Sequence, residues 1–159
     1  MKSVEMASFV KIAGMLLYFF IAAQGAFYHF GFGKALYNIP VENFITLRKA
    51  VDPVVRDRFK VLYLAAIGLM FVWLLLTDKS NGFWSYAPVL LSFLFLLADM
   101  LLILKFSEPV NQLINSDALN GQENFREVRA QWLRFIFLRG YLSVAGFALL
   151  LIQLIFNQE

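Results

Sequence analysis

Two residues of opposite charge lie inside apolar parts of this sequence and are its strongest candidates for chemistry. Asp99 lies six residues before Lys105, and Arg139 lies five residues after Arg134. At 1.5 Å per helical residue, each lies about 7 to 9 Å inside a basic boundary. A carboxylate in hydrocarbon costs several kcal/mol unless it is paired, protonated or hydrated. We therefore predict that Asp99 and Arg139 share a depth and form an ion pair.

Four more polar side chains are expected near this pair. His29 and Tyr63 each lie within five residues of a basic position, which predicts the same layer, while Gln24 and Tyr28 lie one helical turn apart and reach further inward. An imidazole or a carboxylate can take a proton, and a guanidinium can stabilise an anion. The cluster thus fits acid–base chemistry on a bound ligand, and it fits equally well a structural role in which the ion pair sets the helix register.

The composition excludes several kinds of site. The chain has no cysteine and one histidine, so thiol chemistry, thiolate metal sites and a haem with two histidine ligands are excluded within one protomer. It also lacks a glycine-rich phosphate loop, a nucleophile elbow and a paired-histidine metal helix. We expect no metal and no cofactor. The basic residues lack an aromatic groove pattern, so we expect no nucleic acid partner.

The elements that must position these residues are long and apolar. Of the 159 residues, 60% are hydrophobic and 17% aromatic, which is more than a soluble domain of this size needs for its core. Four apolar runs, at 9–32, 61–77, 83–104 and 135–156, are each close to the length that crosses a bilayer core about 30 Å thick. The sequence predicts an all-α integral membrane protein, with residues 1–159 forming a single domain. We expect a four-transmembrane-helix, up-and-down bundle.

The first connection carries a further helical pattern. Apolar residues recur at helical spacing after Pro40, beside charged positions. This predicts a short amphipathic helix lying on the membrane surface. Its apolar residues are Val41, Phe44, Ile45, Leu47 and Val51.

The distribution of basic residues predicts the orientation. The two longer connections together hold ten lysines and arginines, whereas the opposite side has Lys2, Lys11 and Lys79. Basic residues prefer the cytoplasmic side, so both longer connections are expected in the cytoplasm. Both termini then lie outside, and the protein is expected in the bacterial inner membrane. Membrane lipids are expected partners, and homo-oligomer formation stays open because lipid-facing and partner-facing apolar surfaces look alike.

The order of several short motifs resembles a known family. The motif LYNIP ends at Pro40, EPVN occupies 108–111 after the third apolar run, and Trp132 lies seven residues before Arg139. Together they resemble the anthrone oxygenase-like (DUF1772) family of small four-helix membrane proteins. The resemblance covers most of the chain, and the family-like residues are Pro109, Asn111, Trp132 and Arg139. It implies oxidation of a polycyclic anthrone by molecular oxygen without a recognised metal or flavin.

The leading functional hypothesis follows from the cluster and the resemblance. It is a cavity near the cytoplasmic leaflet that binds a small apolar, aromatic or quinone-like ligand. An anthrone-type reaction implies His29 or Asp99 as base and Arg139 as the electrostatic stabiliser of the anion. The ligand-binding candidates are Gln24, Tyr28, Tyr63, Pro109, Asn111 and Trp132.

Two alternatives remain open from the sequence. One is a non-enzymatic bundle that binds lipid or protein, in which Asp99 and Arg139 are a structural pair. The other is a small transporter, which with four spans requires a dimer and depends on Asp99 for proton coupling.

Overall fold

The computed structural model describes residues 2–80, 82–116 and 122–156, and its side chains from residue 5 to 80, 82 to 116 and 124 to 155. Lys2, one of the basic residues used for the orientation, therefore has its side chain outside the described part. Every regular element in the described part is helical. In chain order they are α1 (Lys2–Phe27), the segment η1 (Tyr28–Phe32), in which the chain kinks at Gly31, α2 (Gly33–Asn38), α3 (Val41–Leu76), α4 (Phe83–Leu102), the π-helical segment η2 (Ile103–Ser107), α5 (Glu108–Asn115) and α6 (Gln122–Phe156).

Four stretches of this chain are long and apolar enough to cross a membrane, as the four apolar runs predict. They are Glu5–Asn38, Val41–Leu76, Phe83–Asn115 and Asn124–Ile155. Each is longer than its apolar run because the helix continues into the polar connection. At 1.5 Å per residue, the 36 residues of α3 extend for about 54 Å, well beyond a hydrocarbon core of about 30 Å.

The segment after Pro40 is helical, but it does not form the separate surface helix expected from its pattern. Val41, Phe44 and Ile45 are buried at the start of α3, which continues without a break through Pro53 to Leu76. The physical reason is that Phe44 and Ile45 pack against apolar side chains of α5 and α6. With its apolar side covered by protein, the segment has no need to turn onto the membrane surface.

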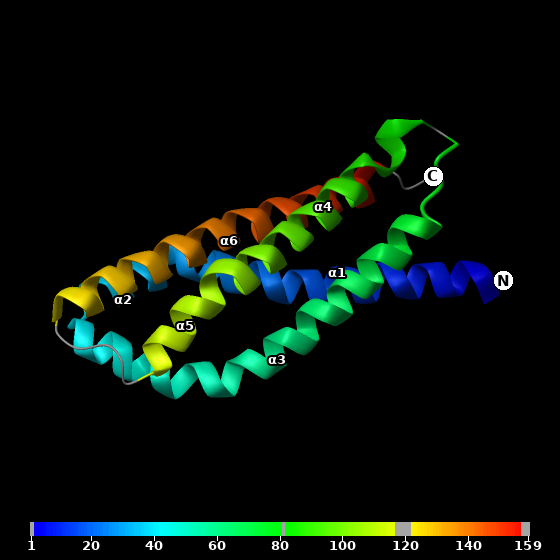
Figure 1. Cartoon of the computed structure of the whole chain (residues 1–159). Helices are drawn as coiled ribbons and strands as arrows, with labels where there is room; N and C mark the ends of the chain where they lie inside the picture. The colour runs from blue at the N-terminus through cyan, green and yellow to red at the C-terminus, as the bar shows by residue number, and fades with distance from the viewer. Residues whose placement is uncertain (1, 81, 117–121, 157–159) are drawn as a thin grey trace.

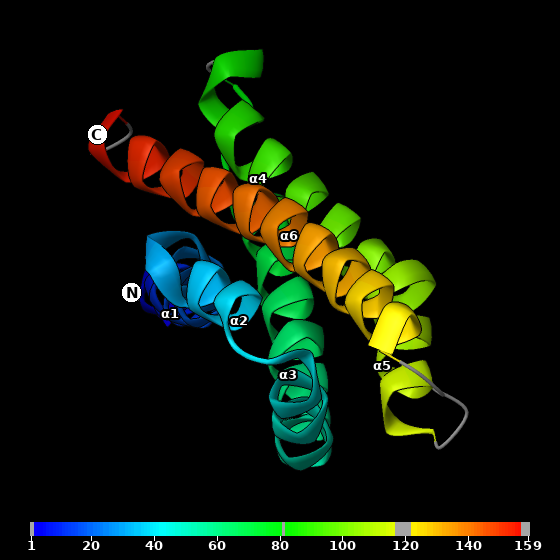
Figure 2. The same cartoon turned by 90° about the vertical axis from the view of Figure 1, so that its left-hand side faces the viewer.

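The four long helices run alternately up and down. The start of α1, the end of α6 and the turn between α3 and α4 lie at one end of the molecule, and the α2–α3 connection and the start of α6 lie at the other (Figure 1). Helix α1 packs against α3 and α6, and α4 packs against the same two helices. Seen along the bundle, α6 crosses in front of α4, while α3 lies below (Figure 2).

The turn between α3 and α4 is held by its own hydrogen bonds. The backbone N–H and the hydroxyl of Ser80 donate to the Asp78 carboxylate and lower the pKa of that carboxyl group.

The interior holds two apolar cores, one after the other along the bundle. The first contains fully buried Tyr18, Met70, Trp73 and Leu96 from three helices. The second contains the side chains Leu36, Phe44, Ile45, Val110, Ile114, Val128, Trp132, Leu133 and Ile136. The outer faces of the long helices are also apolar, with Phe9, Phe20, Val61, Leu101 and Ile155 among many exposed large side chains.

Glycines allow α1 and α6 to approach each other closely. A Cβ added to Gly25 would lie 2.6 Å from the Gly140 Cα and 2.7 Å from the Ser143 Oγ. Backbone atoms cannot rotate away as a long side chain can, so this contact requires a residue without a side chain at position 25.

We expect Gly25→Ala to destabilise the bundle by about 1 to 3 kcal/mol, because the added methyl group pushes α1 away from α6. Thermal unfolding of the purified protein in detergent measures the change. Gly68→Ala is the matched control, since a Cβ at Gly68 meets nothing within 4 Å. Equal stability of the two variants would contradict the close packing of α1 and α6.

Candidate functional site

The predicted pairing of Asp99 and Arg139 is confirmed. Arg139 Nε donates to Asp99 Oδ1 at 2.8 Å, and the carboxylate side chain is 1% exposed. Tyr63 completes a three-residue cluster, because its hydroxyl donates to Asp99 Oδ2 at 2.5 Å and accepts from Arg139 Nη2 at 3.1 Å. The cluster joins α3, α4 and α6. Both carboxylate oxygens are thus satisfied, and Arg139 Nη1 is left without a partner in the described part of the chain.

A second set of polar contacts holds the helices that carry this cluster. Tyr18 of α1 donates its hydroxyl to the Ser92 carbonyl at 3.0 Å. The Ser92 hydroxyl of α4 lies 2.8 Å from the carbonyl oxygen of Gly146 on α6. These buried contacts set the depth of α4 relative to α6. Asp99 follows Ser92 by seven residues, two turns along the same helix face, which brings it beside Arg139.

A polar network lies next to the cluster, on the side that the predicted orientation assigns to the cytoplasm. Sequence reasoning did not name the following residues of this network as site candidates. Asp52 Oδ1 accepts from Arg48 Nη2 at 3.2 Å, and Asp52 Oδ2 pairs with Arg56 at 3.3 Å and accepts from Asn115 Nδ2 at 2.7 Å. Arg56 also pairs with Glu108 at 2.9 Å, which ties α3 to α5. The signal that could have found them is their spacing, since 48, 52 and 56 recur at four-residue intervals on one face of a helix.

Trp132 lies at the centre of this network. Its Nε1 donates to Asn111 Oδ1 at 2.9 Å, and the same oxygen accepts from Arg48 Nη2 at 3.3 Å. The Arg48 guanidinium lies 4.5 Å from the centre of the Trp132 ring. Tyr28 contacts the indole from η1, edge to face, with 5.7 Å between the ring centres. The orientation of the indole is therefore held from three sides.

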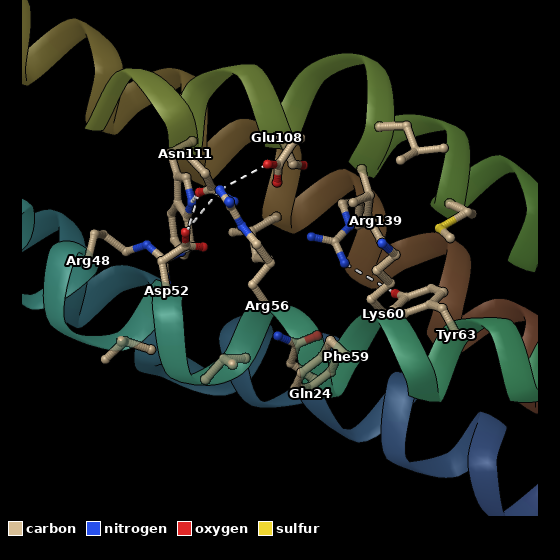
Figure 3. A pocket seen from close by; sticks show the side chains of 18 of the residues that line it. Gln24, Arg48, Asp52, Arg56, Phe59, Lys60, Tyr63, Glu108, Asn111 and Arg139 are labelled. Atoms are coloured by element: carbon tan, nitrogen blue, oxygen red, sulfur yellow. Dashed lines mark hydrogen bonds and ion pairs between the residues drawn. The ribbon is translucent and has the colours of Figure 1, made fainter. Parts of the chain in front are cut away.

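A cavity of about 660 Å³ lies between the Arg139 cluster and the Arg48 network. Polar and charged side chains lie at both ends, and the wall between them is mainly apolar, with Phe27, Phe59, Met100, Ile103 and Ile136. Figure 3 shows the cavity between α3 and the helices of the third span, with Arg139 on its far side and Arg56 reaching across it toward Glu108. A volume of this size accommodates a small organic ligand.

The π-helical segment η2 aligns the third span with this cavity. Asp99, Ile103, Ser107, Asn111 and Asn115 occur at every fourth position. In a regular α-helix every fourth residue drifts by about 40° around the axis, so Asn115 would end far from the side of Asp99. A π-helical turn holds more residues than an α-helical turn, and η2 removes part of this drift. Asn111 and Asn115 consequently face α3, where they bind Arg48 and Asp52.

The structure brings together most of the residues predicted for the site. Six of the nine line the cavity, and Asp99 lies directly behind the Tyr63 hydroxyl. His29 and Pro109 are outside the lining. Pro109 is exposed in the first turn of α5, and His29 Nε2 lies 3.0 Å from the Phe137 carbonyl, against the ring of Tyr141. The six lining residues are Gln24, Tyr28, Tyr63, Asn111, Trp132 and Arg139.

Among the described residues no group of three or more histidine, cysteine, aspartate or glutamate side chains is arranged to hold a metal ion. Comparison of the chain with models of protein families, with curated proteins and with solved structures finds no match.

We expect Asp99→Asn to lower the free energy of unfolding by about 3 to 5 kcal/mol, because Arg139 then remains as a buried charge without a counter-ion. The double variant Asp99→Asn and Arg139→Gln removes both charges and should recover much of the loss. Unfolding in detergent measures both, with Asp57→Asn, an exposed carboxylate on α3, as the control. Equal losses in the single and double variants would show that the two charges are not coupled.

Proposed function

We propose that the four long helices insert into the bacterial inner membrane with both termini outside the cytoplasm. The exposed apolar side chains on the outer faces of the spans support insertion, because water would not solvate them favourably. The ten basic residues of the two longer connections support the orientation. On this orientation the cavity lies near the cytoplasmic leaflet.

The orientation can be tested because the chain has no cysteine. Ser80→Cys places a thiol in the short turn between α3 and α4, and Gln112→Cys places one on the exposed side of α5. In intact spheroplasts we expect a membrane-impermeant thiol reagent to label position 80 and to label position 112 only after lysis. The opposite pattern would reverse the orientation.

We infer that the cavity binds a small, largely apolar aromatic ligand. The observation that carries this inference is the position of the Arg139 guanidinium in the wall of a mainly apolar cavity. The Arg139 side chain is 12% exposed, and its Nη1 has no partner among the described residues. Gln24 and Tyr28 also line the cavity and have no hydrogen bond within the described chain. Partly buried polar groups that face a cavity take acceptors or donors from a ligand or from water. Aromatic side chains, including Tyr28, Phe59 and Trp132, offer surfaces for a flat ring.

We propose further that the chain belongs to the anthrone oxygenase-like family. Three of the four family-like residues, Asn111, Trp132 and Arg139, line the cavity, and this shared location supports the resemblance. The fourth, Pro109, lies in the first turn of the helix that carries Asn111. In the proposed reaction the CH₂ group of an anthrone becomes a carbonyl, one atom of O₂ enters the product and the other leaves as water.

The geometry supports definite roles in such a reaction. The Tyr63 hydroxyl takes a proton from the activated CH₂ carbon as its own proton passes to Asp99 Oδ2. The electron pair of the broken C–H bond moves to the anthrone oxygen, and Arg139 Nη1 stabilises the resulting anion. The carbanion form then reduces O₂ to a carbon-bound peroxide anion, which takes the proton back from Asp99 through the Tyr63 hydroxyl. The resulting hydroperoxide loses water to give the ketone, and Asp99 and Tyr63 return to their starting forms. His29 has no part in this scheme, because it lies outside the cavity.

We expect Arg139→Met to lower turnover of anthrone about 10²- to 10³-fold, since removal of one oxyanion donor has this effect in other enzymes. Tyr63→Phe should lower it about 10²-fold or more, while the buried ring keeps the packing. Oxygen consumption with anthrone in lipid nanodiscs measures both. Arg134→Met is the matched control, because Arg134 is exposed on the same helix and outside the cavity. Full turnover in folded Arg139→Met would refute the assigned role.

A further inference from the structure

The cavity reaches the surface of the protein between α3 and η2. Five lining residues are exposed: Phe27 on α1, Arg56, Asp57 and Lys60 on α3, and Leu104 on η2. Figure 3 views the cavity between α3 and the third span. We call the opening bounded by Arg56, Asp57, Lys60 and Leu104 the mouth.

The mouth lies at the edge of the apolar part of the bundle. Lys60 comes directly before the second apolar run, and Leu104 comes directly before Lys105 at the end of the third. Leu104 is 57% exposed, and the neighbouring lipid-facing residue Leu101, one turn earlier, is 56% exposed. An opening at this depth faces the layer where the lipid headgroups meet the acyl chains.

The cytoplasmic end of the cavity is closed by side-chain contacts. Arg56 is bound by Asp52 and Glu108, and Arg48 is held by Asp52, Asn111 and the Trp132 ring. A ligand that came from the cytoplasm past this network would have to separate several ion pairs. At the mouth it passes Leu104, whose side chain makes no ion pair and can move aside.

The formal charges around the cavity balance. Its described lining has four cations and three anions, and Asp99 behind Tyr63 adds a fourth anion. An anionic ligand would lose its hydration without meeting a net positive charge, which is unfavourable in a low-dielectric site. An uncharged ligand avoids this cost. The cations are Arg48, Arg56, Lys60 and Arg139, and the anions are Asp52, Asp57, Asp99 and Glu108.

From these observations we propose that the cavity takes its ligand in uncharged form and from the membrane, sideways through the mouth between α3 and η2. The proposal rests on the ligand-binding function inferred above. It adds the charge state of the ligand and its source, and it names Leu104 as the residue at the point of entry.

The absence of cysteine in the chain allows a direct test of the route. Leu104→Cys is modified with a bulky maleimide, and Leu101→Cys, which is equally exposed but outside the lining, is the matched control. The probe is 9,10-anthraquinone, added to the protein in nanodiscs, and its binding is followed by the quenching of tryptophan fluorescence. The part of the quenching that is lost in Trp132→Phe measures binding of the probe in the cavity. We expect modification at 104 to slow association and dissociation about tenfold or more while the dissociation constant changes little, because a barrier affects both directions alike.

The outcomes separate the two proposals. If the unmodified protein binds the probe and modification at 104 leaves the association rate unchanged, entry through the mouth is overturned while ligand binding stands. If the unmodified protein gives no quenching that depends on Trp132, the proposed ligand-binding function itself is overturned, and the entry route with it.

The same quenching measurement tests the preferred charge state of the ligand, with two probes that share one ring system. Anthraquinone-2-sulfonate carries a permanent negative charge, and we expect it to bind about tenfold more weakly than anthraquinone at equal membrane concentration. Glu108→Gln removes one anion from the cavity and should strengthen sulfonate binding selectively, whereas Glu127→Gln outside the lining should not. Equal affinity for the two probes in the wild-type protein would overturn the preference for an uncharged ligand.

Discussion

The cost of burying an ionised carboxylate among apolar helices constrains the whole bundle. Asp99 lies in the third span with its side chain almost fully buried, and a carboxylate there is tolerated only with a counter-ion and full hydrogen bonding. Arg139 and Tyr63 satisfy both needs, and they come from two other helices. The depth and rotation of α3, α4 and α6 are therefore set together at this point. Glycine contacts between α1 and α6, which place Gly25 against Gly140, attach the remaining helix.

The cavity is a consequence of how the polar groups are distributed. One apolar core fills the bundle beyond the Asp99 cluster, and a second fills it around Phe44 and Ile114. Between them α3 and the third span are connected mainly through polar side chains, which form directional bonds at fixed lengths and do not fill space as interlocking apolar chains do. The space that remains has charged groups at its ends and apolar walls. This combination is typical of sites that orient an apolar ligand by a few polar contacts.

The function proposed here depends on one asymmetry in the cavity. At the deep end Arg139 Nη1 has no partner among the described residues, and its guanidinium is backed by a carboxylate. At the other end Arg48 and Arg56 are already paired with Asp52 and Glu108, although the buried Arg48 Nε has no hydrogen bond in the described part. A positive group whose charge is balanced in the resting state attracts no anion strongly. It can still stabilise negative charge that develops on a bound ligand in a site that excludes water, which is the condition under which electrostatic catalysis is most effective.

The sequence by itself determined the four long helices, their alternating direction, the pairing of Asp99 with Arg139 and six of the residues that line the cavity. These features follow from local rules: apolar length sets a span, and a charge in an apolar run needs a partner at its own depth. The tertiary structure alone decided that Arg48, Asp52 and Arg56 belong to the site, because their amphipathic pattern fits a surface helix as well as a buried one. It also placed His29 outside the cavity lining, since rotation of a helix by half a turn separates a lining residue from one that contacts a neighbour's backbone. Depth along a helix can be counted from the sequence, but the direction in which a side chain points depends on which helices pack beside it.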